Sequence, residues 1–166
     1  MKKVIFSALI VFLIQYSFAQ KDTLDHFKVY GNISHHDEML EDAKIELFDG
    51  DDLIKTYNTN KKGHFEIHLL EDRHYTLKVE KEDFITKKIE INTMMLKDHE
   101  PHKKEHQLHF NCHMERFPKN ATLEEMKELD HPFAILNYDQ ESRNFKWDER
   151  YTKRMELLEK KLSRKH

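Results

Sequence analysis

The chain has 166 residues, of which 28 are Lys or Arg and 31 are Asp or Glu, so its formal net charge is −3. Because the two signs are interspersed and form no basic stripe, the sequence lacks the electrostatic footprint of a nucleic-acid-binding protein. The length allows one domain with appendages. Cys112 is the only cysteine, so no internal disulfide is possible and the fold must be stabilised by packing.

Residues 1–19 have the three parts of a secretory signal peptide. Lys2 and Lys3 form a basic start, residues 4–14 form an apolar run, and small residues precede the expected cleavage after Ala19. The alternative is an N-terminal membrane anchor, but the run is short for a membrane span. We therefore expect an exported protein, periplasmic or secreted, with no stable membrane span once the signal is removed.

Between residues 27 and 115 the apolar side chains recur with a period near two, and turn-forming residues interrupt them at short intervals. This pattern predicts a mainly β protein, and specifically a seven-stranded Ig-like β-sandwich. The expected strands are 27–33, 43–48, 53–59, 63–69, 75–79, 85–91 and 105–115.

The turn before the fourth strand is the clearest local signal. Gly63 supplies the positive φ that a tight turn needs, and Phe65 and Ile67 after it share one face of a strand. We expect one core to contain the apolar side chains of several strands. Its predicted members are Phe65, Ile67, Tyr75, Leu77, Phe110 and Cys112.

The sixth strand contains a polar residue on its apolar face. Ile85, Ile89 and Ile91 have the same parity, but Lys87 falls between them. A charged side chain is costly to bury without a partner. The sequence therefore predicts an edge strand or a bulge that turns Lys87 outward.

Four segments together resemble the carboxypeptidase regulatory-like domain family. They are VYGNI at 29–33, LEDAKIEL at 40–47, TNKKGHF at 59–65 and YTLKV at 75–79. The resemblance covers roughly residues 27–117, and it implies a transthyretin-like sandwich and a non-catalytic accessory role. Asn60 stands where the family usually has aspartate, but an asparagine oxygen can cap the same turn.

The pattern changes after Pro118. Thr122 opens a capping-box helix, residues 133–138 form an extended segment, and a last helix begins near Asp148. One face of that helix has the apolar stripe Trp147, Tyr151, Met155, Leu158 and Leu162. We expect this stripe to pack on the sandwich, with pairing to a second copy as the alternative.

The expected organisation is a signal peptide at 1–19, a carboxypeptidase regulatory-like sandwich at 20–117 and a C-terminal extension with an amphipathic helix at 118–166. The extension resembles, less specifically, segments found beside such sandwiches in exported proteins of Bacteroidetes-type bacteria.

Thirteen histidines are the compositional oddity of the chain. Histidine is a common metal ligand, and His99, His102, His106 and His109 are the candidate ligands for Zn or Cu. Further histidines are available at 35, 36, 64, 68 and 113. The alternative is that all of these are solvent-facing polar residues, because no spacing fits a closed zinc site.

His35 and Glu38 have the His-x-x-Glu spacing that the catalytic domain of zinc carboxypeptidases uses for two ligands. A catalytic zinc also needs a third protein ligand and a shaped pocket, for which the sequence gives no signal. We therefore expect no catalytic residues, no enzyme activity and no cofactor. The expected function is an exported, non-catalytic cell-envelope module that binds a protein or a glycan. The alternative is a periplasmic histidine-rich protein that binds Zn or Cu.

Overall fold

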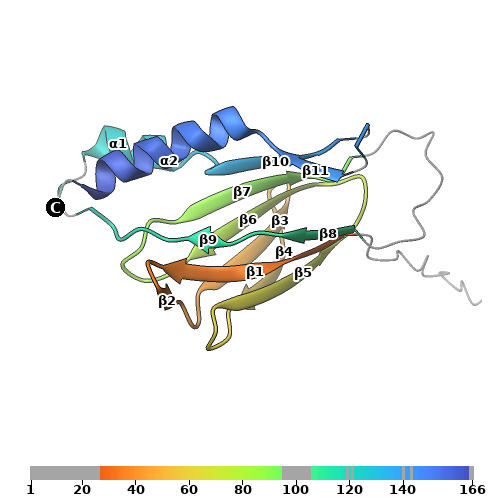
Figure 1. Cartoon of the computed structure of the whole chain (residues 1–166), viewed down its shortest axis with the longest axis horizontal. Helices are drawn as coiled ribbons and strands as arrows, with labels where there is room; N and C mark the ends of the chain where they lie inside the picture. Colours follow the sequence, from red (N-terminus) through yellow and green to blue (C-terminus); the bar gives the residue numbers. More distant parts are fainter. Residues whose placement is uncertain are drawn as a thin grey trace, which may run out of the picture.

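The computed structural model describes residues 27–94, 106–118, 120, 122–139, 141–142 and 144–164. The predicted signal peptide at 1–19 lies outside these residues. The described chain is mainly β, with two stacked sheets and two helices at one side (Figure 1). Within this part of the chain, neither helix is both long enough and apolar enough to cross a membrane.

The larger sheet has six strands in the order β11-β10-β7-β6-β3-β4. These are β3 (Lys44–Asp49), β4 (Asp52–Asn58), β6 (His74–Glu80), β7 (Lys87–Asn92), β10 (Ala134–Asp139) and β11 (Asn144–Trp147). All neighbours are antiparallel except β10, which runs parallel to β7. The segment after Pro118 therefore adds two strands to a sheet that begins at residue 44.

The smaller sheet is built around β1 (Phe27–His35). Antiparallel β5 (His64–Leu69) and the short β2 (Glu38–Met39) pair with one edge of β1. Parallel β8 (His106–His109) and β9 (Cys112–His113) pair with its other edge. The strand predicted at 105–115 is thus present as two short strands separated by two residues.

Gly31 explains why the two short strands can lie so close to β1. A Cβ atom at Gly31 would approach the Phe110 carbonyl oxygen to 1.7 Å, so only glycine fits this crossing. Next to it, the Asn32 backbone N–H donates to the Asn111 side-chain oxygen at 3.2 Å. A side-chain acceptor therefore replaces a backbone acceptor where the ladder is interrupted.

The turn before β5 is confirmed in detail. Gly63 has φ +66°, and a Cβ there would come within 2.4 Å of the Ile33 carbonyl oxygen. The Asn60 side-chain oxygen accepts from the backbone N–H groups of Lys62 (2.9 Å) and His64 (3.1 Å). Asparagine therefore caps this turn as expected from the sequence.

The predicted core is also confirmed. Phe65, Ile67, Tyr75, Leu77 and Cys112 all lie in one buried cluster. Phe110 is half-buried and packs against the same cluster. Alternating burial along β1, β5 and β6 shows that one face of each strand supplies this core.

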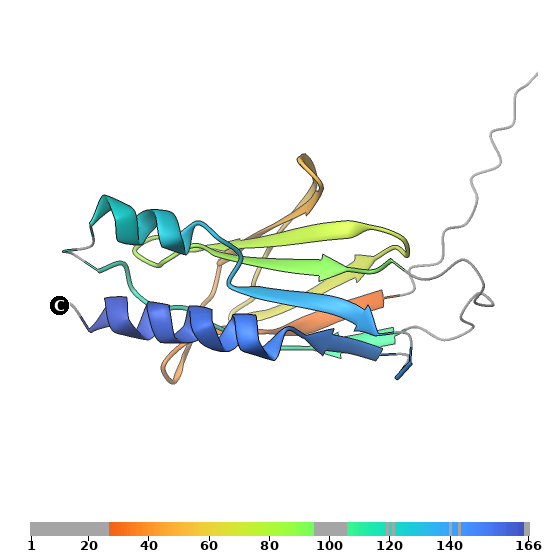
Figure 2. The same cartoon turned by 90° about the horizontal axis from the view of Figure 1, so that it is seen from above.

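The two helices are capped as the sequence predicts. In α1 (Leu123–Leu129), Thr122 and Glu125 form both bonds of a capping box. In α2 (Glu149–Ser163), the Asp148 carboxylate accepts from the Tyr151 N–H at 2.9 Å. The helix α2 lies alongside β10 (Figures 1 and 2). Two residues of its apolar stripe, Met155 and Leu162, are buried. The expected packing of its apolar stripe on the sandwich is confirmed.

The prediction for Lys87 is wrong. Its strand β7 is an interior strand between β6 and β10, and Lys87 is only 3% exposed. Its ammonium group lies 2.9 Å from the Glu159 carboxylate of α2 and 3.7 Å from the centroid of the Phe133 ring. A partner 72 residues away in the sequence therefore makes the inward orientation of the lysine possible.

Candidate functional site

A cavity of about 720 Å³ lies beneath α2, where the C-terminal ends of β1 and β9 meet β7. Because β1 and β9 are parallel, their C-terminal ends lie at the same end of the smaller sheet. The wall contributed by α2 extends from Thr152 to Arg164. Three aromatic residues also line the cavity, namely Phe110, Phe133 and Trp147.

Two polar atoms of α2 are buried in this region without a hydrogen-bonding partner among the described residues. They are Oε1 of Glu159 and Oγ1 of Thr152, and both residues line the cavity. The second carboxylate oxygen of Glu159 accepts from Lys87. Burial raises the pKa of Glu159, and the nearby Lys87 charge acts in the opposite direction. The cavity therefore contains hydrogen-bonding capacity that the fold itself does not use.

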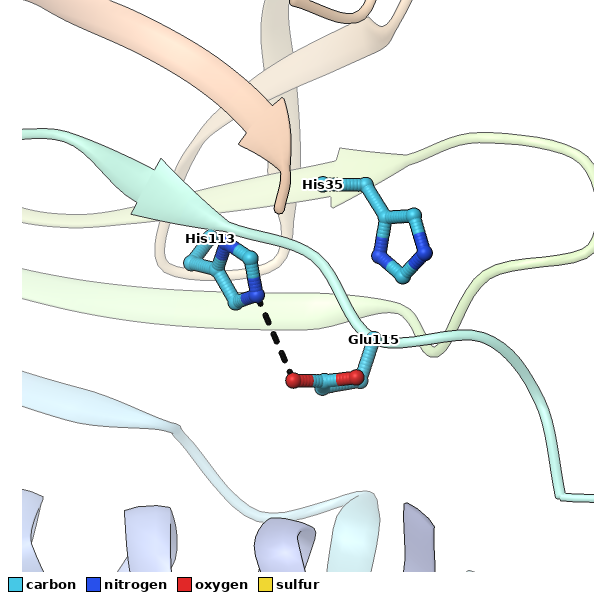
Figure 3. A group of neighbouring side chains, drawn as sticks. All are labelled: His35, His113 and Glu115. Carbon is cyan, nitrogen blue, oxygen red and sulfur yellow. Dashed lines mark ion pairs between the residues drawn. The ribbon is translucent and has the colours of Figure 1, made fainter. Parts of the chain in front are cut away.

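Three potential metal ligands converge at the end of β1 and β9, namely His35, His113 and Glu115 (Figure 3). One ligand atom from each lies within 4.8 Å of the other two. His113 Nε2 is 3.3 Å from a Glu115 carboxylate oxygen. We refer to these three residues as the His35 cluster. All of them line the cavity.

Local hydrogen bonds orient the His35 cluster. His35 Nδ1 donates to the Met114 carbonyl oxygen at 2.8 Å, since a carbonyl can only accept. The neighbouring His36 has φ +49° in the tight turn to β2, and its ring centroid lies 4.1 Å from that of His35. Partial burial lowers the pKa of His113, although the Glu115 carboxylate opposes this shift. His113 is therefore mainly neutral at neutral pH.

Cys112 lines the cavity, but its thiol is not activated. Burial raises the pKa of its thiol to about 11, so the thiol is protonated at neutral pH. Its Sγ donates weakly to the Met114 sulfur at 3.9 Å. The inward orientation expected from strand alternation is confirmed, because the residue is 6% exposed.

The four histidines proposed from the sequence are distributed differently. His99 and His102 lie outside the described residues. His106 stacks on Phe27 at 5.5 Å between the sheets, whereas His109 is exposed and lies against Tyr30. Because two of the four candidate ligands are not described, a shared ion at His99, His102, His106 and His109 stays a prediction.

The His-x-x-Glu pair does not form a site among the described residues. Glu38 is exposed in β2, and the carboxylate that joins His35 comes from Glu115 instead. Sequence reasoning missed Glu115, although the alternation His113-x-Glu115 places both side chains on one side of an extended segment. It also missed Glu159, which follows Met155 by four positions and therefore faces the sheet within the apolar stripe.

No family model matches the chain, and no curated protein matches it. Solved structures that are similar to it include the Bacillus anthracis TIE protein, with 9% identity, a TM-score of 0.43 and coverage of 54% of this chain and 17% of that one. Chlorocatechol 1,2-dioxygenase from Pseudomonas putida has 12% identity, a TM-score of 0.41 and coverage of 57% and 63%. The group B streptococcus pilus 2b backbone protein has 10% identity, a TM-score of 0.36 and coverage of 54% and 40%. The match spans less than two thirds of each of these solved chains. Similarities at these TM-scores assign neither a family nor a function.

Proposed function

We propose that this chain is a non-catalytic, exported cell-envelope module, and that the cavity beneath α2 binds a glycan. The volume of about 720 Å³ falls in the range of about 300–1,000 Å³ that is typical of sites for small organic ligands. The basic start, the apolar run and the small residues within 1–19 support export. The turn at Asn60 and Gly63 supports the resemblance to carboxypeptidase regulatory-like modules. Binding to a protein segment is the competing possibility.

The main support for the proposal is a pair of buried polar atoms on α2 that have no hydrogen-bonding partner among the described residues. Glu159 Oε1 can accept a hydrogen bond, and Thr152 Oγ1 can both donate and accept. Leaving such groups without partners costs about 1–3 kcal/mol each. A ligand rich in hydroxyl groups supplies donors and acceptors to both positions.

The aromatic wall suits the same ligand class. Phe110 and Trp147 pack edge to face with their ring centroids 5.7 Å apart, and both line the cavity. Sites for small organic ligands commonly combine such aromatic surface with a few placed polar groups. A sugar ring presents an apolar C–H face to the aromatic wall and hydroxyl groups to the polar one.

The chemistry of the cavity supports a binding role. Its thiol is protonated at neutral pH, and its most buried carboxylate, that of Glu159, is paired with Lys87. Neither group is poised as a nucleophile or a base.

The proposal is tested by titrating chelator-treated protein with a panel of oligosaccharides and following heat or NMR shifts. Replacing Thr152 with Val keeps the shape of the side chain but removes its hydroxyl group. Thr152→Val should weaken glycan binding about tenfold while leaving thermal stability unchanged or higher, because an unpartnered buried polar atom is lost. The matched control is Thr56→Val on the exposed edge strand β4, which should leave binding unchanged.

Two results would contradict this function. One is the absence of any oligosaccharide that binds more tightly than about 1 mM. The other is a bound oligosaccharide whose affinity is the same for Thr152→Val and the parent chain. Binding of a peptide or protein that is sensitive to Thr152→Val would replace the glycan with a protein ligand at the same cavity.

A further inference from the structure

We propose that His35, His113 and Glu115, which line the cavity, form a binding site for a divalent transition-metal ion, zinc or copper. This site goes beyond glycan binding and does not depend on it. It also differs from the four-histidine site expected from the sequence, because its ligands come from the end of β1 and from the segment that includes β9.

The backbone brings these ligands together before any metal is considered. Ser34 pairs with His113 in the parallel register of β1 and β9, and the Met114 N–H donates to the Ser34 carbonyl oxygen at 2.7 Å. His113 and Glu115 are two positions apart on an extended segment, so their side chains project to the same side. His35 follows Ser34 directly, and its ring stacks on that of His113 with centroids 6.0 Å apart.

The three ligand atoms need to move only slightly closer together to bind one metal ion. Zinc binds imidazole nitrogen and carboxylate oxygen at about 2.0–2.2 Å, so neighbouring ligand atoms in a tetrahedral site lie about 3.4 Å apart. His113 Nε2 and the Glu115 oxygen are already 3.3 Å apart. The full set spans at most 4.8 Å, so closing the site needs a movement of about 1–1.5 Å by side chains, chiefly that of His35.

The ligand types select the class of ion. Two imidazoles and one carboxylate suit zinc and copper, whereas magnesium and calcium prefer sites made entirely of oxygen. The exposed His36 ring lies 4.1 Å from the His35 ring and 5.7 Å from the His113 ring, measured between centroids, and can supply a fourth ligand. The positively charged residue next to Glu115 in the sequence is Arg116, and its guanidinium lies over the Phe84 ring, 5.2 Å from the ring centroid. The Met114 carbonyl, which accepts from His35, is the kind of outer partner that orients ligating histidines.

The test is a titration of the chelator-treated full chain with Zn²⁺ and, separately, with Cu²⁺. The expected result is one ion per chain with Kd of about 1 μM or tighter, and no comparable binding of Mg²⁺. His35→Asn, His113→Asn and Glu115→Gln should each weaken Zn²⁺ binding about tenfold or more. The EPR spectrum of the Cu²⁺ form should show at least two nitrogen ligands, and should lose one in His113→Asn.

His68 provides the matched control. Its Nε2 lies 3.1 Å from a Glu66 oxygen on β5, so His68→Asn removes an exposed histidine–carboxylate pair outside the His35 cluster. This variant should bind Zn²⁺ like the parent chain. Thermal melting without metal confirms that each variant is folded, and the partly buried Glu115 allows a mild replacement if either histidine variant unfolds.

Two outcomes would overturn the site. The first is Zn²⁺ binding that survives the double replacement of His35 and His113. The second is binding that is lost in a His99→Asn, His102→Asn double variant but retained in Glu115→Gln, which would place the ion among the histidines expected from the sequence.

Discussion

The buried ion pair of Lys87 and Glu159 allows a direct test of how the contact between β7 and α2 contributes to the stability of the fold. Both residues are at least nine-tenths buried, and their charged groups are 2.9 Å apart. Removing one partner of such a pair leaves an uncompensated charge and costs about 3–5 kcal/mol, whereas replacing both partners with apolar side chains is often neutral. We therefore expect Lys87→Met and Glu159→Met each to lose about 3–5 kcal/mol of stability, and the double variant to be about as stable as the parent chain.

For a chain of this size, 1 kcal/mol shifts Tm by about 2–4 °C. Each single variant should therefore melt about 6–20 °C below the parent chain, and the double variant should melt within a few degrees of it. Thermal unfolding followed by circular dichroism measures all four proteins. If each single variant costs less than about 1 kcal/mol, or if the double variant loses the sum of both, the pair is not coupled as the structure indicates.

The pair also predicts a dependence on pH. Burial raises the pKa of Glu159 in the folded state above its unfolded value of about 4.5, so the folded state binds this proton more tightly. The resulting contribution to the free energy of unfolding is fully present below the unfolded pKa and is lost as the pH rises through the folded pKa. In Lys87→Met the opposing positive charge is absent, so the pKa should rise further. The destabilisation by Lys87→Met should therefore be larger at pH 8 than at pH 5. An equal loss at both values would show that Glu159 does not titrate in this range.

Gly31→Ala should cost about 3 kcal/mol or more, because its Cβ would collide with the Phe110 backbone. At Gly50 a Cβ would meet nothing within 4 Å, so Gly50→Ala should cost only about 1 kcal/mol, which comes from the φ of +60°. Urea unfolding compares the two, and equal losses would contradict the close approach of the strands. Asn60→Ala should lose about 1 kcal/mol from the two backbone hydrogen bonds to its side chain, and Asn60→Asp should restore most of it. Deleting residues 118–166 should expose the β7 edge and the Lys87 charge and give an aggregating chain, as measured by light scattering. A soluble, cooperatively melting fragment would instead support an independent sandwich at 20–117.

The features that the sequence predicted well are those that depend on neighbouring residues. The Asn60–Gly63 turn, the alternation of Phe65 and Ile67 and the Thr122 capping box are all decided within a few positions. Local chemistry also predicted the start of α2 near Asp148. These elements were sufficient to predict a mainly β sandwich with a C-terminal helix.

The features that the sequence could not predict depend on distant pairing. Lys87 is buried because Glu159 reaches it from α2, and periodicity within one strand carries no information about that partner. The His35 cluster depends on the parallel register between β1 and β9, which joins residues 79 positions apart. The spacing of histidines along residues 99–113 therefore pointed to His99, His102, His106 and His109, whereas the cluster formed by the described residues is His35, His113 and Glu115.

The parallel pairing of β1 also has a consequence for how the chain folds. One edge of β1 cannot be completed until residues 106–113 are available, because Phe27 pairs with His106 and Ser34 with His113. Closing such a long loop is entropically costly, so pairings of this range form slowly. A nascent chain would therefore present an unpaired β1 edge for most of its synthesis. That strand is where we expect a chaperone to bind first and where premature association between copies would begin.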